Sequence, residues 1–350
     1  MMKSFYSLIL MGLLGLSSCK VDPVIIPVLP VNDLREIVPQ GWPAAKYTFS
    51  VNAISAEAFV LGRSLFYETL LSKDNTISCA SCHMNKAAFS NPDHNLSHGI
   101  NGILGKRNAP GIFNLTWHPY FMHDGGINHI EVQPLGPISN RIEMAENINN
   151  VISKLQGTDK YKTLFKNAFG TEEVTTQRMF RAMAQFMGLI YSYNSKYDKV
   201  IRNEEGMVFT EAESRGYALF QANCNACHKE PLFTDFQFRN NGMRVDPQVN
   251  DSGRAHITNQ AIDLYKFKTP SLRNLAHTYP YMHDGSLATL QACLDHYTSG
   301  VVNITNLDPY LQSGGLKLSA EDKKDLIAFL LTLTDNTIAS DSRFADPNIK

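Results

Sequence analysis

The sequence lacks several features that would assign it to a common functional class. Its 32 Lys and Arg residues are matched by 33 Asp and Glu residues, the net charge is -1, and no basic cluster stands out. This balance argues against nucleic acid or another polyanion as a partner. The one marked apolar run, residues 8–16, is too short to span a bilayer as a stable anchor. Convincing runs of strand-forming residues are also missing, so we predict a mainly α protein.

What the sequence does contain is six cysteines, four of which form two copies of one pattern. C-x-x-C-H occurs at residues 79–83 and again at 224–228. In c-type cytochromes the two thiols bond to the edge of the haem, and the adjacent histidine binds the iron. We therefore predict two covalently bound haem c groups, held by Cys79, Cys82 and His83 and by Cys224, Cys227 and His228.

Paired cysteines also serve other purposes. Four thiolates suit zinc, and each pair alone could form a redox dithiol or a structural disulfide. Here a histidine follows each pair directly, the two pairs lie far apart, and no βαβ unit surrounds either one. These features favour haem. Cys293 is left over, and its apolar helical setting is typical of a buried, unreactive thiol.

The first residues have the features of an export signal. Lys3 precedes the apolar run, and the lipobox-like sequence L-S-S-C ends at Cys19. We expect residues 1–18 to be a lipoprotein signal peptide and Cys19 to carry lipid, with an ordinary signal peptide as the alternative. The mature protein is then periplasmic and bound to the membrane by its N-terminal lipid only. Residues 19–50 contain five prolines and are predicted to be an extended linker.

Two further patterns repeat along the chain. A G-x-x-L-F segment precedes each C-x-x-C-H, beginning at Gly62 and at Gly216. Residues 110–125 and 270–285 share the order P-x-x-x-N-L, P-Y and M-H-D-G, with the same spacing from asparagine to histidine. We interpret the chain as an internal duplication that gives two tandem cytochrome c-like haem domains.

Helical patterns mark the extent of these domains. Capped starts occur at Ser55, Thr210 and Ser319, and one pattern runs from residue 176 to 200. The predicted units are the signal peptide 1–18, the linker 19–50, an N-terminal haem domain 51–204, a C-terminal haem domain 205–318, and a C-terminal helix and tail 319–350.

Together these motifs resemble those of the bacterial dihaem cytochrome c peroxidases, a family that also includes the methylamine dehydrogenase maturation enzyme MauG. The resemblance runs from about residue 55 to 335. It rests on I-S-C-A-S-C-H (77–83), R-N-A-P (107–110), Q-P-L-G-P-I (133–138), E-M (143–144), T-P-S-L-R-N (269–274) and P-Y-M-H-D-G (280–285). It implies that the N-terminal haem is peroxidatic and that the C-terminal haem feeds it electrons.

For the peroxidatic haem, the resemblance implies two distal residues. Glu143 matches a glutamate that moves a proton between the peroxide oxygens, and Gln133 matches a glutamine that orients peroxide or water. His98, with His94 as its competitor, matches a loop histidine that caps the iron until partial reduction. The alternative for His98 is an exposed histidine without a ligand role.

At the second haem this chain departs from the usual peroxidases. Where they place a methionine ligand it has Tyr297, as MauG does, and a phenolate would lower the haem potential. His296 and Met282 are alternative ligands, and Tyr297 could simply be a packed aromatic. His123 stands where relatives place a tryptophan between the haems.

The resemblance also implies Ca²⁺ at the domain interface, held by oxygens of Asn108, Thr278 and Pro280. The implied function is reduction of hydrogen peroxide to water with electrons from a small donor protein, either a cytochrome c or a cupredoxin. The alternatives are a MauG-like oxidase that modifies a protein substrate and a non-catalytic dihaem electron carrier. A homodimer is compatible with the sequence.

Overall fold

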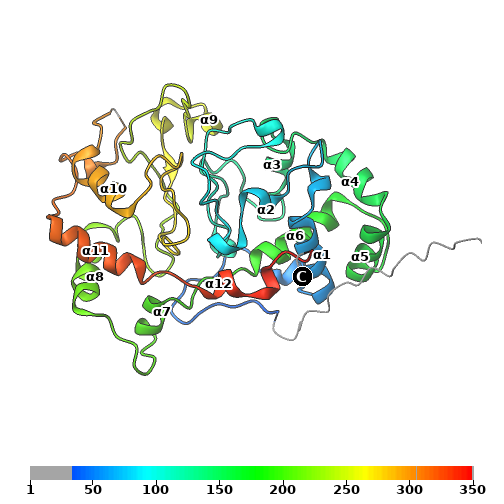
Figure 1. Ribbon diagram of the computed structural model, residues 1–350, viewed down its shortest axis with the longest axis horizontal. Coiled ribbons are helices and arrows are strands. Elements are labelled where there is room, and N and C mark those ends of the chain that lie inside the picture. The colour runs from blue at the N-terminus through cyan, green and yellow to red at the C-terminus, as the bar shows by residue number, and fades with distance from the viewer. Residues whose placement is uncertain (1–33, 305, 349–350) are drawn as a thin grey trace, which may run out of the picture.

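The computed structural model describes residues 34–304 and 306–348, and it is mainly helical (Figure 1). Its only strands in that part of the chain are β1 (Phe238–Arg239) and β2 (Phe267–Lys268), which pair antiparallel. The predicted signal peptide, Cys19 and the first part of the predicted linker lie outside the described residues. Within them, no helix is long and apolar enough to cross a membrane.

The helices follow one another along the chain in the order of their labels. They are α1 (Ala56–Phe66), α2 (Cys79–Cys82), α3 (Leu135–Ser139), α4 (Ile148–Gln156), α5 (Asp159–Phe169), α6 (Thr176–Gly188), α7 (Lys196–Ile201), α8 (Glu211–Asn223), α9 (Ala255–Thr258), α10 (Leu290–Asp295), α11 (Ala320–Leu331) and α12 (Thr337–Ser340).

The three predicted helix starts are confirmed. Ser55 caps α1 through its hydroxyl, which accepts a hydrogen bond from the Ala58 amide. Thr210 and Ser319 begin α8 and α11 with capping boxes, in which each hydroxyl and an acidic side chain three residues later satisfy one another's backbone amides.

The helical pattern predicted from residue 176 to 200 is broken. The helix α6 ends at Gly188, and residues 190–194 are not helical. Side chains from distant segments hold this stretch: Ser192 donates its amide to Asn114 Oδ1, and the amides of Tyr193 and Asn194 donate to Asp335 Oδ2. These tertiary hydrogen bonds replace the ones that a continuous helix would make.

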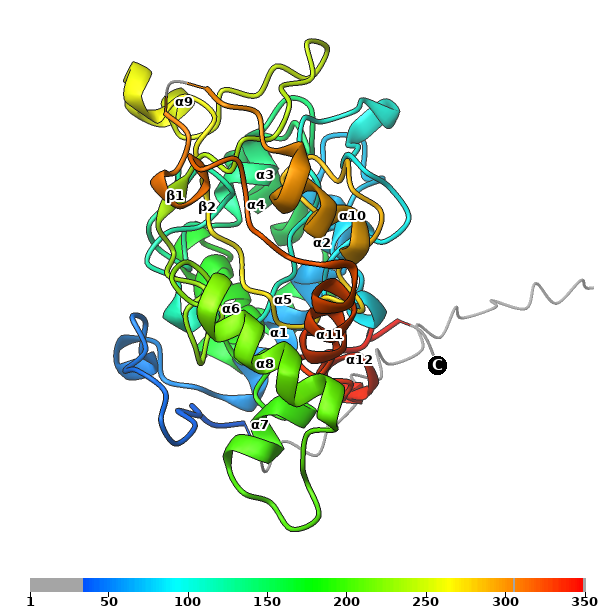
Figure 2. The ribbon, with the colours of Figure 1, turned by 90° about the vertical axis from the view of Figure 1, so that its left-hand side faces the viewer.

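Two pairs of helices cross at matching glycines. A Cβ at Gly62 of α1 would lie 2.0 Å from the carbonyl oxygen of Ala182 on α6, and a Cβ at Gly216 of α8 would lie 2.0 Å from that of Asp325 on α11. Each glycine therefore lets two helix backbones touch. Figure 2 views the molecule from the side where α8 and α11 lie next to each other.

We expect Gly216→Ala to destabilise the protein by about 2 kcal/mol, because the helices must move apart to admit the methyl group. A fall in the midpoint of thermal unfolding measures this. Gly157→Ala is the matched control, since its Cβ would meet no atom closer than 3.4 Å and its change should stay within about 0.5 kcal/mol. A Gly216→Ala protein as stable as the parent would contradict the close crossing.

The buried apolar residues form two separate clusters. The larger one surrounds α1 and α4 to α6, and the smaller one surrounds α8 and α11. Residues 42–49, within the predicted linker, pack on the larger cluster; the Trp42 ring lies 4.9 Å from that of Trp117. The chain returns there at its end, where Phe344 is buried and Tyr67 donates to its carbonyl. Both ends of the described chain therefore pack on the larger cluster, which we call the N-terminal cluster. The smaller cluster is the C-terminal cluster.

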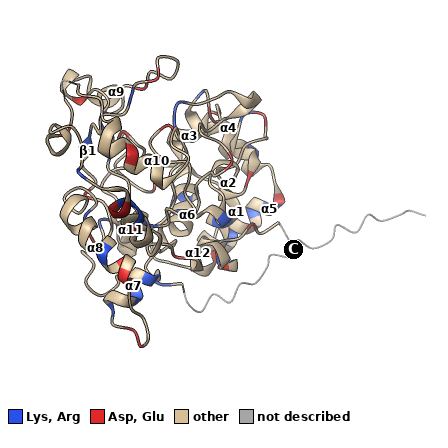
Figure 3. Cartoon of the chain, turned by 60° about the vertical axis from the view of Figure 1, so that its left-hand side comes forward, with Lys and Arg blue, Asp and Glu red and all other residues tan. Residues whose placement is uncertain are grey.

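Basic and acidic residues lie side by side on the helices of the C-terminal cluster (Figure 3). Lys196 on α7 pairs with Glu213 on α8 at 2.6 Å, and Arg215 on α8 pairs with Asp325 on α11 at 2.7 Å. The side chains of the basic partners, Lys196 and Arg215, are exposed, so water screens both ion pairs and each adds little stability.

Candidate functional site

The first C-x-x-C-H forms α2 and ends at His83, and we call Cys79, Cys82 and His83 the first site. The His83 Nδ1 atom lies 2.8 Å from the carbonyl oxygen of Phe89. Burial lowers the pKa of His83, so the imidazole is neutral near pH 7. A histidine that donates through Nδ1 to a carbonyl has a fixed ring orientation and presents Nε2 to a metal.

The second C-x-x-C-H follows α8, and we call Cys224, Cys227 and His228 the second site. Its histidine Nδ1 lies 3.1 Å from the carbonyl oxygen of Pro270 and 3.3 Å from that of Phe233. Burial lowers the pKa of His228 as well. The two sites therefore hold their histidines in the same way.

These thiols and histidines fit haem c better than the alternatives. All five described cysteines are free, so no disulfide closes either motif. Among the described residues, no group of three or more His, Cys, Asp or Glu side chains is arranged to hold a metal ion directly. What each site does offer is two thiols and one oriented imidazole, which is the set that covalent haem attachment requires.

Glu143 lies beside the first site. Burial raises the pKa of the Cys82 thiol to about 11, and the nearby Glu143 carboxylate adds to that rise. Burial also raises the pKa of Glu143, against a 2.7 Å hydrogen bond from Asn140 Nδ2 and the positive charge of Arg107. The structure thus brings the predicted proton carrier to the predicted peroxidatic site.

Gln133 lies just before α3, in the segment that continues to Glu143. Its Nε2 is 4.0 Å from the sulfur of Met122. Met122 has a left-handed backbone with φ 65° and belongs to the repeated M-H-D-G segment. Gln133 therefore contacts the repeated M-H-D-G segment, and no hydrogen bond among the described residues joins it to Cys79, Cys82 or His83.

A loop containing both candidate capping histidines lies next to Cys82 of the first site. The Nε2 atoms of His94 and His98 are 3.3 Å apart, and Cys82 Sγ lies 3.8 Å from the His98 carbonyl oxygen. Gly99 packs so closely on Glu143 that a Cβ would lie 2.4 Å from its Cα. The structure therefore places His98 near Glu143 and Cys82, with His94 in contact with it.

Tyr297 lies in a single π-helical turn, His296–Gly300, directly after α10. Burial raises its pKa to about 12, and interactions with the thiols of Cys293, Cys224 and Cys227 add to the rise. Its phenol therefore lies near the thiols of the second site. Asn241 contacts all three candidate ligands. Its side-chain amide donates to the Met282 sulfur at 3.5 Å. Its backbone carbonyl accepts a hydrogen bond from His296 Nε2 at 3.0 Å, and its side chain forms a hydrogen bond with the Tyr297 phenol.

Cys293 is partly buried on α10, and burial raises the pKa of its thiol to about 12. Burial is thus partial, and the lack of reactivity stays a prediction. Trp117 is only 2% exposed, and its indole N–H donates to the Pro43 carbonyl.

The segments between the two sites meet through their backbones. Asn108 donates its amide to the His283 carbonyl at 2.7 Å, and Lys268 donates its amide to the His123 carbonyl at 2.7 Å. Burial lowers the pKa of His123 to about 3, and its Nε2 lies 3.0 Å from the Asn108 carbonyl oxygen. His123, predicted to stand in place of a tryptophan, is thus a neutral, partly buried group at this junction.

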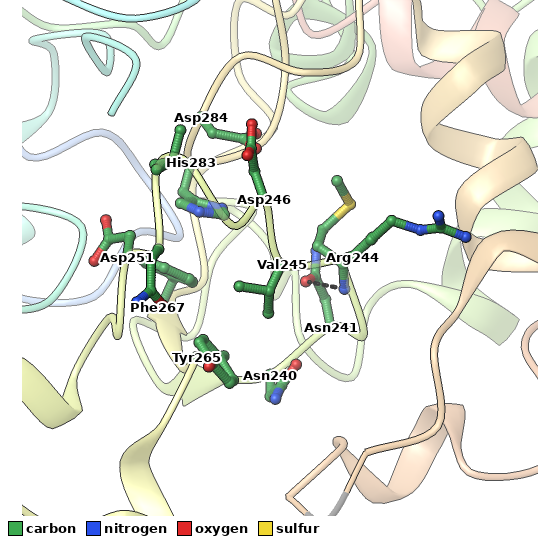
Figure 4. A pocket seen from close by; sticks show the side chains of 13 residues that line it. Asn240, Asn241, Arg244, Val245, Asp246, Asp251, Tyr265, Phe267, His283 and Asp284 are labelled. Atoms are coloured by element: carbon green, nitrogen blue, oxygen red, sulfur yellow. Dashed lines mark hydrogen bonds between the residues drawn. The ribbon is translucent and has the colours of Figure 1, made fainter. Parts of the chain in front are cut away.

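Sequence reasoning gave no role to Arg107, although it lies in one of the matched motifs. Its guanidinium binds Asp124 at 2.6 Å and Asp251 at 2.6 Å, and so ties the junction to the loop after β1. That loop lines a pocket with His283 and Phe267 on one side and Asn241 on the other (Figure 4). Asp251 carries no local sequence signal, because its partner is 144 residues away.

Arg273 is a second residue without a predicted role. It is fully buried and makes a two-pronged ion pair with Asp198 of α7 at 2.7 and 2.8 Å. It also donates to the Pro231 carbonyl, close to His228 in the chain. Arg273 therefore links the segment after His228 to α7. Removing either partner of this buried pair would leave an uncompensated charge.

The predicted calcium residues lie near the same junction. Asn108 donates its side-chain amide to the carbonyls of His94 and Asn95 at 3.0 and 2.9 Å, so Oδ1 is the side-chain atom that can accept. Its backbone amide bonds to His283, a few residues after Thr278 and Pro280. These neutral oxygens suit a hard cation whose shell is completed by water.

Comparison with known proteins adds three findings. A family model described as di-haem cytochrome c peroxidase matches residues 56–206. The methylamine utilization protein MauG of Methylorubrum extorquens is 34% identical over 293 residues, covering 81% of this chain and 79% of that protein. The cytochrome c551 peroxidase of Nitrosomonas europaea is 30% identical over 312 residues, covering 87% and 84%.

A solved structure is also similar over most of the chain. It is described as a MauG-like protein associated with microbial copper homeostasis, is 32% identical, and has a TM-score of 0.80. The likeness covers 89% of this chain and 98% of that one.

Proposed function

Because the chain belongs to the dihaem cytochrome c peroxidase and MauG family, in which haem c is covalently bound, we propose that it reduces hydrogen peroxide to water with electrons from a small redox protein. Glu143 carries this proposal. A partly buried carboxylate beside the first site, with its pKa raised by burial, is the proton carrier that peroxide cleavage needs.

The reaction consumes two electrons and two protons for each peroxide and releases two waters. Bound haem supplies a redox-active iron at each site. Glu143 takes the proton from one peroxide oxygen and returns it to the other, so that the departing oxygen leaves as water. Asn140 fixes the position of that carboxylate, and the Gln133 amide orients the substrate. Electrons enter at the second site and cross the junction at His123.

We also propose that the two sites belong to duplicated haem domains, 51–204 and 205–318, and that α11 from the helix and tail 319–350 completes the second domain by packing on α8. Matching contacts support the duplication. Gly62 and Gly216 form equivalent helix crossings, and the Oδ1 atoms of Asn114 and Asn274 each accept a backbone amide from the segment after α6 or α11.

Electron paramagnetic resonance of the fully oxidised and half-reduced holoprotein tests the role of His98. A capping His98 predicts a low-spin first site that becomes high-spin on half-reduction and then reacts with peroxide. A first site already high-spin when oxidised would contradict capping. Two low-spin sites in every state would leave only the electron carrier.

The placement of Tyr297 favours a second candidate function, oxidation of a protein substrate as in MauG. Its phenol lies near Cys224 and Cys227, where a phenolate ligand would stabilise the oxidised iron. A second haem of low potential suits an oxidase, which stores oxidising equivalents, better than it suits a peroxidase, in which that haem donates electrons. Slow peroxide consumption with every small donor protein would support this function over the first.

We expect Tyr297→Met to raise the reduction potential of the second haem by on the order of 0.1 V or more, because a thioether stabilises reduced iron relative to a phenolate. Potentiometric titration of the holoprotein measures the shift. Tyr310→Met replaces a tyrosine that is 65% exposed and should leave both potentials unchanged. Equal potentials in the parent and Tyr297→Met would exclude Tyr297 as a ligand.

Two further parts of the proposal concern binding and location. We propose that Ca²⁺ binds at the junction through the side-chain oxygen of Asn108 and the carbonyl oxygens of Thr278 and Pro280, because neutral oxygens of this kind suit it.

We also propose that the protein works in the periplasm, anchored through lipid on Cys19. Metabolic labelling with a fatty acid tests the anchor, and Cys19→Ala should abolish the label.

A further inference from the structure

The two sites are joined by a reciprocal pair of contacts. Asn108 and Lys268 are 160 residues apart in the chain, and so are His123 and His283. The amide of Asn108 donates to the carbonyl of His283, and the amide of Lys268 donates to the carbonyl of His123, both at 2.7 Å. Contacts that exchange matching positions in this way are the mark of a two-fold relation. The junction therefore has a local pseudo-two-fold axis.

This axis relates two residues with different chemistry. At the first position Asn108 has a neutral amide, and at the second Lys268 has an ammonium. We name Asn108, Thr278 and Pro280 the amide junction, and we name Lys268, His118 and Tyr120 the lysine junction. The same offset of 160 residues pairs Thr278 and Pro280 of the amide junction with His118 and Tyr120 of the lysine junction. The proposed calcium oxygens thus have counterparts around Lys268.

The ammonium of Lys268 occupies that counterpart position. Its Nζ donates to the Tyr120 carbonyl oxygen at 2.8 Å and lies 3.5 Å from His118 Nδ1. Tyr120 is the counterpart of Pro280, whose carbonyl is a proposed calcium ligand. A lysine side chain brings a positive charge and three donors to such oxygens, whereas an asparagine needs a separate cation to do so.

We propose that the Lys268 ammonium is a built-in cation that takes, at the lysine junction, the place a metal ion takes at the amide junction. The inference rests on the proposed duplication and calcium site. It makes Lys268 a positioning residue: its ammonium holds residues 118–124, which carry Met122 and His123, onto β2. Chelators can then loosen only the amide junction, because the cation of the lysine junction is covalent.

The charges around Lys268 are compatible with this role. Burial lowers its pKa to about 8, and the Asp124 carboxylate acts against that shift, so the ammonium is the main form at pH 7. Burial, with a smaller effect of the Lys268 charge, lowers the pKa of His118 far below its usual value. His118 is therefore neutral and does not repel the ammonium.

Calcium stoichiometry of the two-haem holoprotein, measured by isothermal titration calorimetry after chelation, tests the proposal. We expect one Ca²⁺ per parent chain. Lys268→Asn, which copies the amide junction, should bind one Ca²⁺ more, with a Kd on the order of 10⁻⁴ M. Lys268→Met offers no oxygen and should bind the same number as the parent. Without calcium, Lys268→Met and Lys268→Asn should both unfold at a lower temperature than the parent. Added calcium should restore the unfolding temperature only in Lys268→Asn.

The outcomes separate this inference from the calcium proposal. If Lys268→Asn binds no more calcium than Lys268→Met, the built-in cation is wrong, whatever the parent binds. If the parent binds none, the calcium proposal falls, and the built-in cation, which rests on it, falls with it. Should Lys268→Asn fail to fold, Asn108→Lys decides: it should lose the calcium of the parent and unfold at a temperature that chelator does not change. Retained calcium in Asn108→Lys would overturn the inference.

Discussion

Replacing Glu143 with glutamine is expected to lower kcat for peroxide reduction by about 10²-fold to 10⁴-fold while both haems stay in place. Glutamine keeps the shape of the side chain and its contact with Asn140, but it cannot accept a proton at neutral pH. The reason for expecting a large effect is geometric. Glu143 is close enough to the first site for its charge to raise the pKa of Cys82.

Steady-state peroxide consumption with a reduced c-type cytochrome measures this loss, and the haem content of the variant shows that the site is intact. The matched control is Glu205→Gln, which makes the same chemical change in an exposed loop between α7 and α8 and should keep full activity. A Glu143→Gln enzyme that retains more than about a tenth of kcat would exclude this residue as the proton carrier.

The acid limb of the pH profile should carry the same signature. Burial raises the pKa of Glu143 above its ordinary value, and the reaction needs the carboxylate as base. The kcat/KM of the parent should therefore fall as pH drops through this raised pKa, at a higher pH than an exposed glutamate with a pKa of about 4.3 would allow. A profile that stays flat down to about pH 4 would contradict the role of Glu143.

Removing one pair of thiols is expected to remove one haem. Cys79→Ala with Cys82→Ala should lower covalent haem from two per chain to one and abolish peroxide turnover. Cys224→Ala with Cys227→Ala should also leave one haem, and it should lose turnover because the electron entry site is gone. The reduced pyridine haemochrome spectrum counts the haems directly.

Cys293→Ala is the control for both pairs, because Cys293 lies on α10 outside the two motifs. It should leave two haems and normal turnover. Stoichiometric zinc in place of haem in the parent protein, or unchanged haem in a pair variant, would contradict the attachment sites. The first outcome would favour the zinc interpretation of the cysteines.

The parts of this structure that the sequence predicts are local. Ser55, Thr210 and Ser319 begin helices because a hydroxyl, joined at Thr210 and Ser319 by an acidic side chain three residues later, can cap a helix with no help from the rest of the chain. The C-x-x-C-H motifs are equally local, since both thiols and the histidine lie within five residues. Tertiary contacts do not alter either kind of signal.

The parts that the sequence missed depend on distant partners. No local pattern shows that α6 stops at Gly188, because the hydrogen bonds that organise the next residues come from Asn114 and Asp335. Arg273 is likewise matched to Asp198 across 75 residues, and Phe344 packs on a cluster formed almost 300 residues earlier. Single-sequence periodicity does not contain these pairings.

The candidate site was predicted unevenly for the same reason. Glu143 and Tyr297 were found through motifs, and the structure then places each beside the expected cysteines. Arg107 lay inside a motif, but its binding to Asp124 and Asp251 needed the folded chain. The role proposed for Lys268 depends on the hydrogen bond from its amide to the His123 carbonyl, which matches the one from Asn108 to His283.

The most direct test of the central claim is the stoichiometry of catalysed peroxide reduction with a reduced small c-type cytochrome as donor. The account predicts sustained turnover in which two cytochromes are oxidised for each hydrogen peroxide consumed, and loss of that turnover in Glu143→Gln. Peroxide consumption no faster than that of Glu143→Gln, with the donor left reduced, would contradict a peroxidase.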